Sequence, residues 1–270
     1  PVLFFSKGSG GLNFQRSIGI VGTRSATSYG KSLTRKIIED LAIYEPTIIS
    51  GLAYGIDIEA HRAALAVGLP TIAVMGSPIN QIYPAIHRKT AEAILDKGLV
   101  MSEYAPGSKM VPGNFPARNR IIASLSDALI VVEAAEKGGA LITAEIAYSY
   151  DKDVFAVPGN LQSPYSEGCN HLIKKMKANI YTGPEDIAEA LFWVKPGEIQ
   201  NPNPKLDLSS YQEDEQTILS YLIEKGESEI DQICYATEIP LGILSSKLLA
   251  LEFEGILKSL PGKKYKLLVR

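Results

Sequence analysis

Short, almost wholly apolar runs alternate with helical segments along the first two thirds of this chain, and this alternation constrains the fold most. Segments 29–44 and 57–67 place apolar side chains at helical spacing, as at Leu33, Ile37 and Leu41. Strands without a polar face are typical of parallel sheets covered by helices on both sides. The sequence therefore predicts a doubly wound α/β domain with a mainly parallel sheet. Its expected strands are residues 18–21, 47–50, 71–75, 99–102, 128–132 and 154–157.

A change of composition divides the chain near residue 195. The segment that follows is rich in proline and asparagine, which is typical of a linker. Beyond it, three amphipathic helical segments precede two short strands around a Pro-Gly turn, the pattern of a winged helix. We expect a large domain over 1–194 with a leader over 1–16, a linker over 195–206, and a winged-helix-like domain over 207–270.

The net charge of −3 excludes a protein held to nucleic acid by bulk basicity, but it allows a local basic site. Residues 1–206 carry 20 basic and 19 acidic side chains, a net charge of +1. Residues 207–270 carry 7 basic and 11 acidic side chains, a net charge of −4. Because phosphate contacts dominate affinity for DNA, the acidic domain favours protein docking or a structural role.

The two cysteines, Cys169 and Cys234, lie 65 residues apart and form neither a disulfide framework nor a closed zinc site by themselves. We expect reduced thiols in a cytoplasmic protein. No signal peptide opens the chain, and the uncharged stretch 63–86 is broken by glycine and proline, so no membrane span is expected. Pro1 has no preceding methionine, which suggests a start inside a longer protein.

Three predicted strands end in glycine, at Gly22, Gly51 and Gly76. Such glycines let the backbone approach a ligand, and a following helix offers free N–H groups to an anion. The signal has low specificity, since most α/β domains contain similar turns. The sequence does not match the P-loop, dinucleotide-binding, hydrolase or metalloprotease motifs. For the three histidines, a structural role is favoured over a catalytic one. We therefore expect no metal, no cofactor and no catalytic residue.

The most informative cluster opens a predicted helix and comprises Phe115, Arg118, Asn119 and Arg120. Arginine binds phosphate bidentately, asparagine can read a base edge, and phenylalanine can stack on an unpaired base. Arg24, which follows the first glycine turn, would place a third guanidinium at the same sheet edge. The alternative is that one arginine of the cluster forms a structural salt bridge with Glu103 or Glu133.

A second anion site is predicted where another helix begins after the 128–132 strand. Its members are Lys137, Gly138, Gly139 and Thr143. Two glycines before a helix N-terminus form a nest of N–H groups, to which the lysine adds charge.

The chain resembles the DNA-processing protein A family, also called Smf, of bacterial transformation and recombination mediators. Matching segments run in the family's order over about residues 18–180, and together they are highly specific. They are residues 19–24, 50–57, 60–61, 83–84, 102–103, 115–123, 132–134, 141–144 and 157–159.

This resemblance implies an extended Rossmann-like domain that binds single-stranded DNA, loads the RecA recombinase, forms a homodimer and has no established catalytic activity. We expect that removing Arg24 or Arg118 would abolish most strand binding without loss of fold. The DNA contacts implied by motif are Gly22, Thr23, Arg24, Ser50, Gly51, Phe115, Arg118, Asn119 and Arg120, with the Lys137–Thr143 nest beside them.

Two other functions stay open at this point. An enzyme of the related nucleotide phosphoribohydrolase type would use a glycine-rich motif that Gly138, Gly139 and Glu145 fit in spacing, although Leu141 and Ile142 replace its Gly-Thr pair. A scaffold without a ligand would dock a partner through the winged helix. The clustering of motifs at one sheet edge argues against the scaffold.

Overall fold

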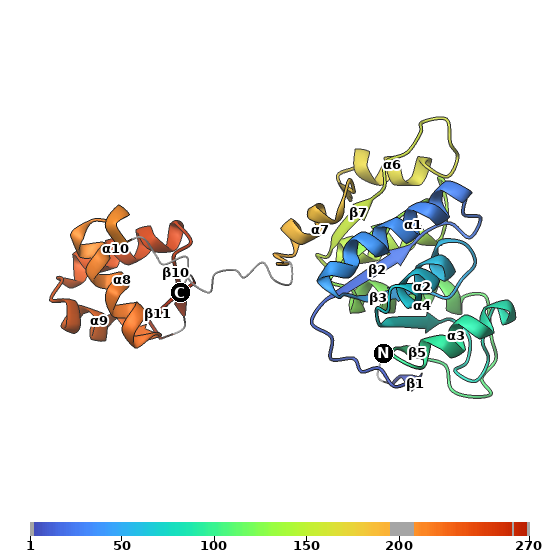
Figure 1. The fold of residues 1–270 in the computed structure, drawn as a ribbon, viewed down its shortest axis with the longest axis horizontal. Coiled ribbons are helices and arrows are strands. Elements are labelled where there is room, and N and C mark those ends of the chain that lie inside the picture. Colours follow the sequence, from blue (N-terminus) through green and yellow to red (C-terminus); the bar gives the residue numbers. More distant parts are fainter. Residues whose placement is uncertain (1–2, 195–207, 261, 269–270) are drawn as a thin grey trace. The chain divides into compact units, whose positions relative to one another are not determined.

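The structure is a computed structural model that describes residues 3–194, 208–260 and 262–268. The chain divides into two compact units, Pro1–Lys195 and Pro196–Arg270 (Figure 1). The predicted linker, 195–206, lies outside the described residues.

The large unit is built on an eight-stranded sheet of order β1-β5-β4-β3-β2-β6-β7-β8. All neighbouring strands are parallel except β1, which pairs antiparallel with β5, so the expected doubly wound α/β fold is confirmed. The predicted leader over 1–16 contributes β1 to this sheet. The strands are β1 Phe5–Lys7, β2 Ser17–Val21, β3 Thr47–Ser50, β4 Thr71–Met75, β5 Leu99–Ser102, β6 Ala128–Val131, β7 Asp153–Ala156 and β8 Asn179–Ile180.

Helices cover both faces of this sheet (Figure 1). Successive side chains of a strand point to opposite faces. Ile18 and Ile20 of β2 therefore pack in one core with α1, α2 and α7, and Val21 packs in a second core with α4, α5 and α6. Each fully buried isoleucine contributes about 1.5–3 kcal/mol to stability. The helices are α1 Ser28–Leu41, α2 Ile56–Ala66, α3 Arg88–Ile94, α4 Asn114–Leu125, α5 Gly139–Ser149, α6 Glu167–Lys174 and α7 Pro184–Ala190.

The strand order creates a switch point at β2, the first strand of the parallel series. The chain builds outward from β2 through β3, β4 and β5, then returns to add β6, β7 and β8 on the other side. The connections that leave β2 and β6 thus diverge at the carboxyl edge of the sheet. In open sheets of this kind, ligands bind in the crevice outside those strand ends.

Over residues 208–260 and 262–268, the small unit contains three α-helices and a three-stranded sheet of order β10-β11-β9. Three helices followed by a β-hairpin agree with the winged helix that the sequence predicts. Ile218, Ile233 and Leu248 are fully buried in its core, one from each helix. The elements are α8 Glu213–Lys225, β9 Ser228–Glu229, α9 Ile230–Thr237, α10 Leu241–Phe253, β10 Leu257–Leu260 and β11 Lys264–Leu267.

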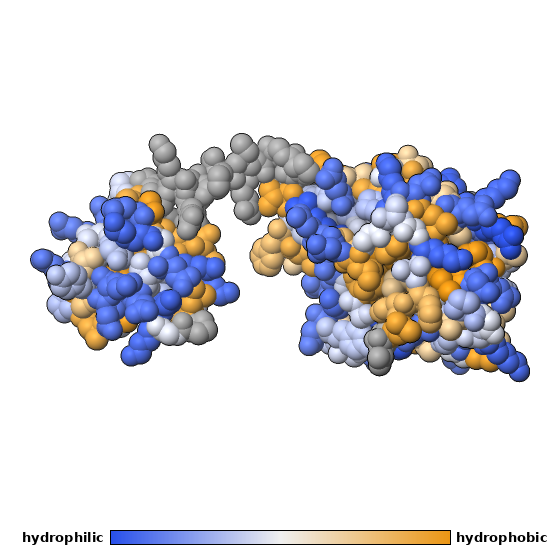
Figure 2. Space-filling view, turned by 90° about the horizontal axis from the view of Figure 1, so that it is seen from below, coloured by the Kyte–Doolittle hydropathy of each residue, from blue (hydrophilic) through white to orange (hydrophobic). Residues whose placement is uncertain are grey.

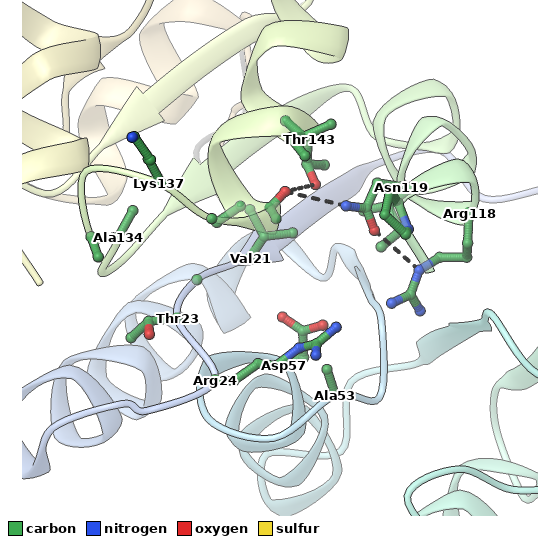
Figure 3. A pocket seen from close by; sticks show the side chains of 18 residues that line it. Val21, Thr23, Arg24, Ala53, Asp57, Arg118, Asn119, Ala134, Lys137 and Thr143 are labelled. Atoms are coloured by element: carbon green, nitrogen blue, oxygen red, sulfur yellow. Dashed lines mark hydrogen bonds between the residues drawn. The ribbon is translucent and has the colours of Figure 1, made fainter. Parts of the chain in front are cut away.

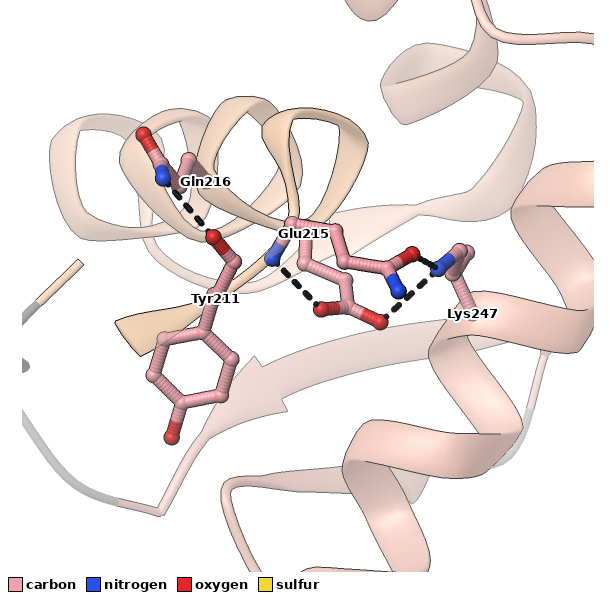
Figure 4. A network of polar contacts seen from close by, with 5 residues as sticks. Tyr211, Glu215, Gln216 and Lys247 are labelled. Carbon is pink, nitrogen blue, oxygen red and sulfur yellow. Dashed lines mark hydrogen bonds and ion pairs between the residues drawn. The ribbon is translucent and has the colours of Figure 1, made fainter. Parts of the chain in front are cut away.

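Lys247 of α10 ties this helix to the start of α8 (Figure 4). Its Nζ donates to the side-chain oxygen of Gln212 and lies 3.0 Å from Oε1 of Glu215. The backbone N–H of Gln212 donates to the other Glu215 oxygen at 3.0 Å, which completes a capping box. Burial alone would raise the pKa of Glu215, but this N–H and Lys247 together hold it below its usual value.

Replacement of Lys247 by methionine should destabilise the contact between α8 and α10 by about 1 kcal/mol. Hydrogen exchange of the α8 amides in the full chain should then be about fivefold faster at pH 7. The lowered pKa of Glu215 stabilises the folded state at pH values above the pKa of this carboxyl group in the unfolded chain. That stabilisation is lost as the pH falls through the pKa of the folded state. Lys225→Met, which breaks the exposed pair with Glu224, is the control and should change nothing measurable. Equal exchange rates in both variants would contradict the prediction.

Large apolar side chains also remain at the surface of both units, among them Ile86, Leu161, Tyr235 and Phe253. On the face drawn in Figure 2, hydrophobic patches lie between hydrophilic side chains. Within the described ranges, no single helix is long and apolar enough to cross a membrane. The pair α9 and α10, bent by 115°, passes that test together by length and composition only.

Candidate functional site at the carboxyl edge of the sheet

A pocket of about 490 Å³ lies outside the carboxyl ends of β2 and β6, at the switch point of the sheet. Four segments far apart in sequence form its walls (Figure 3). They are the β2–α1 turn, the start of α2 with the loop before it, one face of α4, and the β6–α5 loop with the first turn of α5.

Nine of the thirteen site residues predicted from sequence line this pocket: Gly22, Thr23, Arg24, Arg118, Asn119, Lys137, Gly138, Gly139 and Thr143. The other four do not line it: Ser50, Gly51, Phe115 and Arg120. The structure thus gathers both predicted anion sites into one concavity. Contact of these residues with DNA stays a prediction.

Arg24 and Lys137 line the pocket from different loops, one after β2 and the other after β6. The Arg24 guanidinium lies beside Asp57, whereas the Lys137 side chain points away from Asp57 at the rim of the pocket (Figure 3). Both side chains are exposed. Within the parts of the chain that the structure describes, neither makes a hydrogen bond or an ion pair. Two exposed cations that line one concave site, with Arg118 behind them, outnumber its one acid, Asp57, and create a positive potential that attracts an anionic ligand.

Arg118 supplies a third positive charge, but from a buried position with only 3% of the residue exposed. Its Nη1 donates to the carbonyl of Gly51 at 2.5 Å and also to the carbonyl of Val74, so it ties α4 to the ends of β3 and β4. Its Nε donates to Oδ1 of Asn119 at 3.2 Å. Burial lowers the pKa of Arg118 to about 10, partly offset by Asp57, so the guanidinium stays charged at neutral pH.

Asp57, in the first turn of α2, is the charged pocket residue that the sequence prediction missed. Burial raises its pKa, and the charges of Arg118 and Arg24 oppose that rise. A Cβ at Gly51 would lie 2.5 Å from Oδ2 of Asp57 and 2.6 Å from Nη2 of Arg118. Glycine at position 51 therefore makes room for these two charged groups, rather than for a ligand. The sequence signal for this residue was an aspartate among the apolar residues of a predicted helix. Its compensating charge, Arg118, lies 61 residues later and could not be paired with it from the sequence.

The start of α5 is held in place by side chains of the pocket (Figure 3). Asn119 donates from Nδ2 to the carbonyl of Gly139 at 3.2 Å, and Thr143 donates from Oγ1 to the same carbonyl at 3.0 Å. Among the described side chains none caps this helix at Gly138, so its first N–H groups depend on solvent or a ligand. Since the hydroxyl proton of Thr143 is used internally, anion binding here rests on the backbone and Lys137.

The remaining three predicted contacts have protein partners. Ser50 is fully buried and donates from Oγ to the carbonyl of Ile20 at 2.6 Å, which joins β3 to β2. The ring of Phe115 packs against Tyr83, with ring centroids 5.5 Å apart. Arg120 pairs with Glu103 at 2.5 Å. The alternative of a structural salt bridge therefore holds for Arg120.

Glu133, the other acid considered for such a bridge, bonds elsewhere. Its carboxylate accepts from the backbone N–H and the hydroxyl of Thr27, at 3.0 and 2.6 Å. Thr27 caps α1 by accepting from the N–H of Gly30. A Cβ at Gly30 would overlap this carboxylate, so any larger residue there would have to displace Glu133. Glu133 thus fixes the start of α1 beside the pocket.

Arg120→Ala should leave the affinity expected for single-stranded DNA within about threefold of that of the unchanged chain. The reason is that the guanidinium already pairs with Glu103 outside the pocket. The stability of the fold should fall by no more than about 1 kcal/mol, as expected for a partly exposed pair. Fluorescence anisotropy with a labelled oligothymidine measures the binding. A tenfold or larger loss would show that Arg120 leaves Glu103 to contact the strand.

Among the described residues, no three His, Cys, Asp or Glu side chains gather where they could hold a metal ion. His61 and His87 are buried, with Nδ1 bonded to Thr71 Oγ1 at 2.7 Å and to the Leu52 carbonyl at 2.8 Å, respectively. Burial lowers the pKa of both histidines, that of His61 to about 3. Both rings are therefore neutral at physiological pH.

Each of the two units matches a known protein family. The family described as DNA recombination-mediator protein A matches residues 1–192, and the DprA winged helix domain matches residues 202–263. Protein Smf of Synechocystis is 37% identical over 98% of this chain and 74% of its own length. DNA processing protein DprA of Streptococcus pneumoniae is 42% identical over 71% of this chain and 68% of its own length.

Two solved structures share the fold of the large unit. The X-ray structure of the Streptococcus pneumoniae protein has a TM-score of 0.65 and 41% identity, and it covers 69% of this chain and 65% of that one. DNA processing protein A of Helicobacter pylori, solved for its single-stranded DNA binding mode, has a TM-score of 0.64 and 32% identity, and it covers 70% of this chain and 86% of that one. The match of the family over 1–192 and the identities of its relatives agree with the motifs of the sequence. This chain belongs to the DNA recombination-mediator protein A family, the DprA/Smf proteins.

Proposed function

We propose that this chain binds single-stranded DNA in the pocket at the switch point of its sheet and acts in recombination by binding, without catalysis. The observation that carries the proposal is that two exposed cations, Arg24 and Lys137, line one concavity without a hydrogen bond or an ion pair among the described residues, beside a helix whose N-cap, Gly138, makes no side-chain hydrogen bond. Phosphates are the ligands that such cations and free N–H groups bind. The single-stranded DNA binding of the Helicobacter pylori relative supports this class of ligand.

The shape of the pocket favours a single strand over a duplex. A cavity of about 490 Å³ is comparable with sites that enclose small ligands, and it can admit a nucleotide. A flexible single strand can turn its phosphates and bases into such a hollow. The stiff duplex keeps its bases stacked inside and offers only its outer backbone.

Fluorescence anisotropy with labelled oligonucleotides tests this function. The full chain should bind an oligothymidine at least tenfold more tightly than a duplex of the same length, and its affinity should fall steeply with salt because counterions are released. Equal binding of both forms would contradict the proposed specificity. Absence of binding to either would contradict the function itself.

Loading of RecA is the finer part of the proposal, and family membership supports it. The chain should shorten the lag of strand-dependent ATP hydrolysis by RecA from the same organism. Arg24→Ala should not shorten it, because the strand would no longer be delivered. The homodimer implied by the resemblance is part of the same proposal, and sedimentation equilibrium of the full chain tests it.

The phosphoribohydrolase alternative finds no support in the position of Glu145. Its carboxylate pairs with Lys177 at 2.6 Å and does not line the pocket. The acid that this alternative requires is therefore paired outside the pocket that Arg24 lines. Release of a free base from a nucleoside monophosphate would reopen this alternative.

A further inference from the structure

A second groove, of about 360 Å³, adjoins the pocket and shares Arg24 with it. We call it the lateral groove. Its walls come from the β2–α1 turn, α1, the β3–α2 loop, α2, and the segment before α3. Because Arg24 lines both hollows, a chain-like ligand that leaves the pocket at Arg24 enters the lateral groove directly.

Three cations line the lateral groove: Arg24, Lys31 and Arg62. All three are exposed, and none of the three side chains makes a hydrogen bond or an ion pair within the described residues. The acid in the lining, Glu59, is buried and accepts from Nε of Arg35 at 2.5 Å. Its charge is thus balanced from outside the groove, and the groove keeps a positive excess.

An aromatic surface lies beside these cations. Tyr54 lines the groove with 49% of the residue exposed. Its ring meets that of His87 edge to face, with centroids 5.0 Å apart, and His87 is itself fixed by its bond to the Leu52 carbonyl. Ile86, which is 73% exposed, adds an apolar surface in the same lining. A supported, exposed ring beside cations is the arrangement that stacks unpaired bases.

We propose that the lateral groove holds the next nucleotides of the strand whose phosphates occupy the pocket, with Lys31 and Arg62 on its backbone and Tyr54 under a base. The proposal rests on the proposed function, since it needs a strand in the pocket. It extends the binding surface from one nucleotide-sized hollow to a continuous path across α1 and α2. It also assigns binding roles to Lys31 and Arg62, which lie outside the family motifs identified in the sequence, and to Tyr54 within segment 50–57.

Oligonucleotide length separates the two hollows. A thymidine oligomer of about four nucleotides can fill the pocket alone, whereas one of about sixteen reaches the lateral groove. The variant Lys31→Gln/Arg62→Gln should lose about tenfold to thirtyfold in affinity for the long oligomer and less than threefold for the short one. Its slope of log affinity against log salt should fall by about 1.4 with the long oligomer, about 0.7 for each lost phosphate contact.

The variant Lys36→Gln/Lys152→Gln removes the same net charge elsewhere and is the control. Lys36 pairs with Asp40 on α1, and Lys152 precedes β7 at the opposite edge of the sheet. This control should bind both oligomers as the unchanged chain does. Tyr54→Leu should weaken binding of the long oligomer at least fivefold, and Tyr54→Phe should restore it, because the ring and not the hydroxyl stacks.

Each outcome decides the question. Unchanged binding of the long oligomer by Lys31→Gln/Arg62→Gln would overturn the lateral groove while leaving the pocket intact. Equal losses with both oligomers, or an equal loss in the control, would reduce the effect to overall charge and overturn it as well. Failure of the unchanged chain to bind either oligomer would instead overturn the proposed function, and this inference with it.

Discussion

Arg24→Ala should weaken binding of single-stranded DNA by about tenfold to a hundredfold, while thermal unfolding stays unchanged. A charged hydrogen bond to phosphate contributes about 1.5–3 kcal/mol, and Arg24 is well placed to make one, because it lines the pocket without a partner among the described residues. Its removal costs the fold little, since the side chain is exposed. Anisotropy and a thermal melt of the same sample measure both effects.

Arg24→Lys is the matched variant for this prediction. It keeps the charge but loses the planar fork that binds a phosphate bidentately, so it should recover only part of the affinity. Unchanged affinity in Arg24→Ala would remove Arg24 from the site. A lowered melting temperature would instead show that Arg24 supports the fold.

Arg118→Met should destabilise the large unit by about 3–5 kcal/mol. The substitution leaves Asp57 buried without its main compensating charge and leaves the carbonyls of Gly51 and Val74 without their donor. The sequence alone suggested that Arg118 could be removed without loss of fold, and its burial changes that expectation. Loss of strand binding by this variant would therefore not identify a contact.

Urea unfolding followed by tryptophan fluorescence isolates this effect. Trp193, the single tryptophan of the chain, packs against the core of the large unit, 5.8 Å from the Tyr44 ring. The midpoint for Arg118→Met should fall sharply, whereas Arg120→Met on the same helix should shift it little. Equal midpoints for the two variants would contradict a structural role for Arg118.

The central strands and the helices that cover them could be predicted because they repeat one pattern. Strands buried on both faces are apolar throughout, and α1 shows its buried face at helical spacing, as at Ile37 and Leu41. The edge strands β1 and β8 escaped prediction, since three and two residues are too few to show a pattern. Strand β1 forms only because β5, more than ninety residues later, offers it a free edge.

The location of the candidate pocket could be predicted from the sequence, but the contacts of each of its side chains could not. Parallel strands bring their carboxyl ends to one edge, so the segments after β2 and β6 had to lie close together. Whether an arginine side chain bonds to other protein groups depends on residues that are distant in the sequence and close in the fold. Arg24 faces the pocket without a partner among the described residues, Arg118 is buried beside Asp57, and Arg120 pairs with Glu103.

The central claim is that the cations of the pocket bind strand phosphates, and the salt dependence of binding by Arg24→Ala/Lys137→Ala tests it most directly. We expect at least a hundredfold loss of affinity for a short oligothymidine at low salt. The slope of log affinity against log salt should fall by about 1.4, with unfolding unchanged. An unchanged slope and affinity in this folded double variant would contradict the claim.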